Sequence, residues 1–152
     1  MNSKFLWWVL IIFWCGIIFY QSSRPAPLSD GQSLYIVNVI NHWVSAIVGK
    51  EVVIVSNHMV RKSAHFTEYL VLGLLFFNGF FSGKAALKAL ALSLVVGVCY
   101  AASDEIHQYF VPGRTMKVTD VMIDGLGVFC GAGMLYLSAL AKLSRAKLGG
   151  VR

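Results

Sequence analysis

Acidic side chains are scarce in this chain of 152 residues. It has seven Asp and Glu residues against 13 Lys and Arg, and only 13% of its residues are charged while 57% are hydrophobic. About a quarter of the residues of a soluble domain are charged, so this composition indicates a membrane protein with a single domain. The net charge of +6 is not arranged as a basic stripe with interleaved aromatic residues. We therefore expect no nucleic acid among its partners.

Cysteine is also rare, and the motifs of several enzyme classes are missing. Cys15, Cys99 and Cys130 lie inside apolar runs without CxxC or Cys/His spacing, which argues against a zinc knuckle and a structural disulfide. The sequence contains no H-E-x-x-H, no G-x-S-x-G and no P-S-G-H. An enzymatic role would therefore have to use some other arrangement of side chains.

Four long apolar segments predict an all-α integral membrane protein. They cover about residues 4–20, 64–81, 85–103 and 118–141, and the short connections between them predict a compact bundle of four transmembrane helices. The first segment lacks an A-x-A cleavage site and carries tryptophans suited to the membrane interface, so we expect a retained helix. Residues 1–141 then form one domain, and residues 142–152 form a basic tail.

A different pattern separates the first two apolar segments. The stretch "QSSRPAPLSDGQS" has the prolines, glycine and serines of a loop. Residues 34–48 that follow carry apolar side chains at helical spacing on one side and Asn38, Asn41, His42 and Ser45 on the other. This segment is too polar to span, and we expect a short amphipathic helix that lies in the interface.

Two of the predicted spans are too short unless they include charged residues. In the second span only residues 69–81 are nearly free of strongly polar groups, and at 1.5 Å per residue they reach about 20 Å. The turns with His65 and Glu68 must therefore enter the membrane, as must those with Asp120 and Asp124 in the fourth span. A lone charge at bilayer depth costs at least about 2.5 kcal/mol, so these groups should face one another or a water-filled cavity rather than lipid.

The order of the spans predicts a shared polar site. The start of the second span, the end of the third and the start of the fourth emerge on the same side of the membrane. These segments hold five of the seven acidic residues and several cations and polar partners: Arg61, Lys62, His65, Glu68, Asp104, Glu105, His107, Gln108, Arg114, Asp120 and Asp124. Gly127 and Gly131 continue the helical stripe of Asp120 and Asp124 and would allow a neighbouring helix to approach closely.

The distribution of basic residues predicts the orientation. Lys4, Lys84, Lys88 and the basic tail lie on the side opposite the polar site. The cations beside the site have acidic partners available. When these are discounted, the excess of Lys and Arg lies on the other side. The positive-inside rule then places both termini in the cytoplasm and the polar site on the extracytoplasmic side of the cell membrane.

Three segments resemble the VanZ-like family of small bacterial membrane proteins: "RKSAHFTEYLVLG", "YAASDEIHQYFVPGRTMKVTDVMIDGLG" and, more weakly, "FYQSSRPAPLSDGQS". The resemblance covers roughly residues 19–131. The family's namesake is an accessory protein of glycopeptide-resistance clusters and is associated with teicoplanin resistance. The resemblance implies a role in the cell envelope that lowers susceptibility to teicoplanin, a drug with a lipid tail that anchors in the outer leaflet.

Three interpretations of the polar site are open. In the first it is an ion-pair network that holds the helices in register. In the second it is a pocket for a lipid headgroup, a peptidoglycan precursor or the lipoglycopeptide itself, in which guanidinium groups bind phosphate. The residues of that pocket would be Arg61, Lys62, His65, Glu68, Glu105, Gln108, Arg114 and Asp120.

The third interpretation is an intramembrane hydrolase that acts on a lipid-linked or phosphate-containing substrate. His107 would be its general base, oriented by Asp104 or Asp124. Alternatively, a divalent metal ion would be the cofactor, held by His65, Glu68, His107 and Asp124. The sequence alone does not decide between the binding protein and the enzyme.

Overall fold

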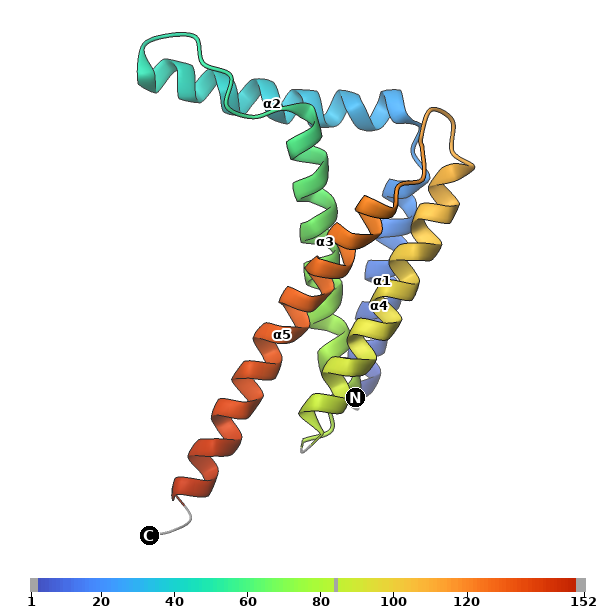
Figure 1. Ribbon diagram of the computed structural model, residues 1–152, viewed down its shortest axis with the longest axis vertical. Helices are drawn as coiled ribbons and strands as arrows, with labels where there is room; N and C mark the ends of the chain where they lie inside the picture. The colour runs from blue at the N-terminus through green and yellow to red at the C-terminus, as the bar shows by residue number, and fades with distance from the viewer. Residues whose placement is uncertain (1–2, 84, 150–152) are drawn as a thin grey trace.

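A computed structural model of the protein describes residues 3–83 and 85–149, and this part of the chain is entirely helical. The helices are α1 (Ser3–Ser22), α2 (Ala26–Val48), α3 (Asn57–Phe80), α4 (Ala86–Tyr109) and α5 (Val118–Gly149). Four of them run roughly along the long axis of the molecule, while α2 lies across one end (Figure 1). The beginning of α1 and the end of α5 lie at the opposite end (Figure 1). The predicted all-α fold is confirmed.

Three helices in the described part of the chain are long and apolar enough to cross a membrane. They are Lys4–Ser22 in α1, Ala86–Tyr109 in α4 and Val118–Ala146 in α5. Large apolar side chains remain exposed on all three, among them Phe13 at 65%, Val95 at 62% and Leu137 at 65%. A helical exterior of this kind suits contact with lipid rather than water.

The prediction of a loop over residues 21–33 is wrong for most of that stretch. The break is limited to residues 23–25, and α2 begins at Ala26 rather than near residue 34. Pro25 and Pro27 flank the start of the helix, where a missing backbone N–H removes no intrahelical hydrogen bond. Prolines that read as helix breakers in the sequence therefore mark a helix start.

Other helices also extend beyond the predicted spans. α3 begins at Asn57, where the Ser56 hydroxyl accepts a hydrogen bond from the Met59 N–H at 3.3 Å and caps the helix. α4 continues through Tyr109 and so keeps the "DEIHQ" segment helical. Residues 142–149, predicted as a tail, continue α5, whereas Lys84 and Arg152 lie outside the described residues.

The closest packing in the bundle joins α3 to α5 through glycines. A Cβ on Gly127 would lie 2.5 Å from the carbonyl oxygen of Phe66, and one on Gly131 would come even closer to the carbonyl oxygen of Leu70. The expected close approach at these two glycines is therefore confirmed. Around this seam lies an apolar core from four helices: Ile11, Ile18, Tyr69, Leu72, Phe76, Ala101 and Val128.

We predict that Gly131→Ala destabilises the protein, because the added methyl group would force the backbones of α3 and α5 apart. The expected loss is about 1–3 kcal/mol, as for other overpacked cores. Thermal unfolding in detergent, followed by tryptophan fluorescence, measures it. Gly133→Ala is the control, since a Cβ there meets nothing within 4 Å. Equal melting temperatures for the two variants would show that the seam is not tightly packed.

Candidate functional site

Buried polar side chains concentrate at the end of the bundle that α2 crosses. They come from the end of α1, the end of α4 and the start of α5, and half-buried polar residues at the start of α3 adjoin them. The buried members are Ser22, Asp104, Glu105, Gln108 and Asp124. With Asp30 on α2, six of the seven acidic residues of the chain lie at this end. The predicted convergence of these segments is thus present in the structure.

Asp104 accepts hydrogen bonds from two helices. Its Oδ2 atom accepts from the Ser22 hydroxyl at 2.8 Å and from Nε2 of Gln108 at 3.0 Å. Gln108 in turn accepts at Oε1 from Nη1 of Arg114 at 3.2 Å. Asp104 and Gln108 thus join α1 to the α4–α5 connection. Nothing in the sequence marked Ser22 except its place in the weakest of the three resembling segments.

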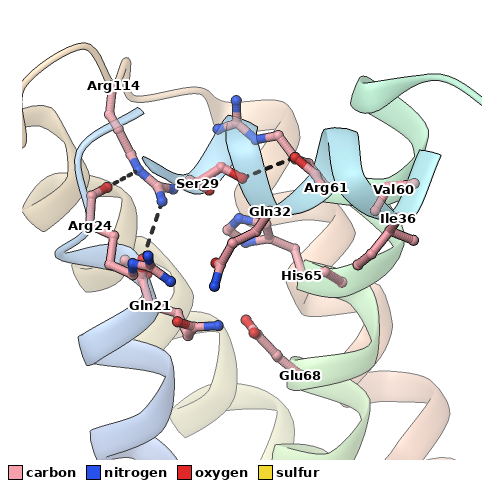
Figure 2. A pocket seen from close by; sticks show the side chains of 13 residues that line it. Gln21, Arg24, Ser29, Gln32, Ile36, Val60, Arg61, His65, Glu68 and Arg114 are labelled. Atoms are coloured by element: carbon pink, nitrogen blue, oxygen red, sulfur yellow. Dashed lines mark hydrogen bonds between the residues drawn. The ribbon is translucent and has the colours of Figure 1, made fainter. Parts of the chain in front are cut away.

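Arg114 fastens the α4–α5 connection to the end of α1 (Figure 2). Its Nε donates to the carbonyl oxygen of Arg24 at 2.9 Å and its Nη2 to that of Gln21 at 3.2 Å. Gln21 lies in the last turn of α1 and Arg24 just beyond it, where backbone carbonyls lack the regular hydrogen bonds of a helix interior. Burial and the nearby charge of Arg61 lower the pKa of Arg114, although a guanidinium stays protonated at neutral pH.

The other two predicted cations also have partners of opposite charge. Arg61 on α3 pairs with Asp30 on α2 at 2.8 Å, and Lys62 pairs with Asp120 at the start of α5. Asp30 was not among the predicted site residues, because a lone aspartate in an apparent loop gives no signal. These pairs tie α2 and α5 to α3, as the ion-pair interpretation expects.

Glu105 and His107 make contacts away from the centre of the site. Glu105 is 1% exposed, and its Oε2 accepts a hydrogen bond from the backbone N–H of Lys117 at 2.8 Å, which fixes the chain before α5. The His107 ring stacks on Phe19 with centroids 4.4 Å apart, and its Nε2 lies 3.0 Å from the Ser23 hydroxyl. His107 therefore contacts α1 rather than a carboxylate.

His65 and Asp124 meet at the centre of the site. Nδ1 of His65 lies 3.6 Å from Oδ1 of Asp124, whose side chain is 0% exposed. In the described part of the chain, His65, Asp104 and Asp124 can present ligand atoms that all lie within 4.8 Å of one another. Of the four predicted metal ligands, the structure thus joins His65 and Asp124 and adds Asp104. Glu68 lines a neighbouring cavity instead, and His107 lies elsewhere.

Two cavities adjoin this centre. One of about 150 Å³ lies between α1, α2 and α3, and Glu68 of α3 and Gln21 of α1 line it (Figure 2). The second, of about 440 Å³, lies towards the α4–α5 connection and Asp120. Arg61, His65 and Arg114 line both cavities. These three shared side chains therefore lie between two cavities at the same end of the bundle.

This fold and this site define a helical membrane protein that gathers its charged side chains at one end of the bundle. The chain belongs to the VanZ/LLP1 family, since the sequence profile of that family matches residues 7–140. The matched range contains every residue of the site and confirms the resemblance seen in the sequence. No curated protein and no solved structure matches the chain.

We predict that Arg114→Gln lowers the free energy of unfolding by about 2 kcal/mol, because hydrogen bonds from a charged group to the carbonyls of α1 are lost. Unfolding in detergent with and without the substitution measures the change. Arg145→Gln, at an exposed position near the end of α5, serves as the control. An Arg114 variant no less stable than the control would contradict the fastening role.

Proposed function

We propose that the chain crosses the membrane four times, with both ends in the cytoplasm. The 24 residues of α3 are long enough to span about 36 Å at 1.5 Å per residue. The cations in its first turns pair with Asp30 of α2 and with Asp120 of α5. The opposite end of the bundle, with Lys88, Lys142 and Arg145, carries none of the seven acidic residues, which suits the cytoplasmic side.

In this arrangement α2 lies in the outer membrane–water interface. Its exposed apolar side chains include Tyr35 at 71%, Trp43 at 65% and Ile47 at 82%. On another side, Asn41 bonds the backbone of residues 54 and 55, so polar groups of the helix are held by the following segment. An apolar face and a satisfied polar face are typical of interfacial helices.

The function that this geometry supports best is recognition of a polar, phosphate-bearing group at the outer leaflet. The observation that carries it is the cavity of about 150 Å³ beneath α2, lined by guanidinium groups and the Glu68 carboxylate. A lipid headgroup or a lipid-linked peptidoglycan precursor presents phosphate and hydroxyl groups at that depth. Guanidinium groups are well suited to bind the phosphate, and a carboxylate is well suited to accept hydrogen bonds from the hydroxyl groups.

We further propose that this recognition lowers susceptibility to teicoplanin-type glycopeptides. Such a drug anchors its lipid tail in the outer leaflet, close to the position proposed for the cavity. Occupation of the headgroup region by a bound envelope lipid or precursor reduces the access of the anchored drug to its target. Membership of the VanZ/LLP1 family supports a role in the cell envelope.

A hydrolase is the second candidate, and the contact of His65 with Asp124 favours it over other enzymatic arrangements. A carboxylate beside an imidazole can orient it as a general base. The pair lies next to the cavity that Glu68 lines, whereas His107 has no such partner. Release of phosphate from a lipid diphosphate by purified protein, lost in His65→Gln, would favour this candidate over the binding protein.

The binding function is tested by drug susceptibility of a sensitive Gram-positive host that expresses the protein. We expect protection against teicoplanin to exceed protection against vancomycin. Glu68→Gln, which removes a charge from the cavity, should lose most of this protection at equal membrane abundance. Glu51→Gln changes an exposed carboxylate outside the cavity and should protect as the original chain does.

Two results would contradict the proposal. If the unchanged chain protects against neither drug, the resistance role is wrong. If Glu68→Gln protects fully at matched abundance, the cavity is not where the protective ligand binds.

A further inference from the structure

Three side chains from three helices converge inside the bundle at the end crossed by α2. His65 comes from α3, Asp104 from α4 and Asp124 from α5, and each can place one ligand atom within 4.8 Å of the others. The two carboxylates are 3% and 0% exposed, so water does not screen their charges well. Convergence of two buried carboxylates and an imidazole favours a bound cation or a proton between them.

Asp124 provides an independent sign that something binds here. Both of its carboxylate oxygens are buried and have no hydrogen-bond partner, and Nδ1 of the facing His65 also lacks one. Buried carboxylates are nearly always hydrogen-bonded, paired or bound to a metal. At 3.6 Å the imidazole is too far away to satisfy Asp124 by a hydrogen bond.

The neighbouring cations are already engaged. Lys62 pairs with Asp120, and Arg61 pairs with Asp30. Arg114 donates to two backbone carbonyls and to Gln108. In the described part of the chain, none of these three cations forms a hydrogen bond or an ion pair with Asp124.

The surroundings of Asp104 resemble those of a metal ligand. Hydrogen bonds from Ser22 and Gln108 both end on its Oδ2, and Oδ1 takes no part in them. Such bonds fix the orientation of a ligating carboxylate. The glycine seam between α3 and α5 holds the other two ligands in place, since Gly127 lies one turn beyond Asp124 and packs against Phe66, next to His65.

We infer that His65, Asp104 and Asp124 form a site for one divalent transition-metal ion, with zinc or manganese as the matching class. One imidazole and two carboxylates suit these ions better than calcium or magnesium, which prefer oxygen alone, or copper(I), which prefers sulfur. Three protein ligands leave a coordination position open, and His65 also lines the cavities on either side. The ion would be reachable from the cavity lined by Glu68.

This inference does not rest on the proposed envelope ligand. A protein that binds zinc but does not protect cells would retain the metal site and lose the resistance role. A protein that protects cells but binds no metal would retain the resistance role and lose the metal site.

Metal content of the full chain, purified in detergent, tests the site. After incubation with zinc or manganese and removal of excess ion, we expect one equivalent by elemental analysis. Asp124→Asn and His65→Gln should each weaken zinc binding by at least about 100-fold, and Ser22→Ala, which loosens Asp104, by about 10-fold. Cobalt(II) used in place of zinc should give visible absorption that His65→Gln removes.

His107→Gln is the matched control, because His107 contacts Ser23 and Phe19 rather than the cluster. It should bind zinc as the original chain does. A folded original chain that holds well below one equivalent of either metal overturns the inference, even if a substituted variant fails to fold. Loss of binding in His107→Gln equal to that in His65→Gln would also overturn it, because the ligands would then be a different set.

Discussion

The close contact of α3 with α5 is the constraint on which the rest of this structure depends. Gly127 and Gly131 let the two backbones touch at Phe66 and Leu70, which larger residues would prevent. His65 precedes the first contact on α3, and Asp124 lies one turn before it on α5. The packing that closes the bundle therefore also brings an imidazole against a fully buried carboxylate, at the level where α1 and α4 add Ser22 and Asp104.

Once these charges are buried, the surrounding chain is arranged to satisfy them. Arg114 turns back to the carbonyls that end α1, Lys62 meets Asp120, and Arg61 holds α2 through Asp30. Part of the site thus has a structural role in joining the helices, as the ion-pair interpretation expects. Asp124 is the main exception, because neither of its carboxylate oxygens has a hydrogen-bond partner although an unsatisfied buried charge is costly. That exception, beside two cavities, is where we place binding of a ligand or metal ion.

Sequence patterns predicted much of this arrangement but not its pairings. Helical periodicity and hydropathy are local patterns, and they predicted the apolar segments and the glycine seam. The convergence of the acidic residues followed from the order in which the spans cross the membrane. The start of α2 did not, since Pro25 and Pro27 read as breakers although the first turn tolerates proline. His107 and Gln108 lie three and four residues after Asp104, and spacing alone cannot tell which one faces it. Tertiary packing turns Gln108 inward and His107 towards Phe19. The partner of Arg61, Asp30, is likewise fixed only by the direction that α2 takes across the bundle.

The central claim is that α3 and α5 pack together at the outer face of the membrane. Lys62 and Asp120, an ion pair at this contact, can both be changed to cysteine in a chain whose Cys15, Cys99 and Cys130 are alanine. Intact cells are then treated with a short thiol cross-linker that cannot cross the membrane, and the linked peptides are identified by mass spectrometry. We predict an intramolecular cross-link in intact cells. A cross-link that appears only after the membrane is opened would contradict the orientation, and no cross-link under either condition would contradict the packing itself.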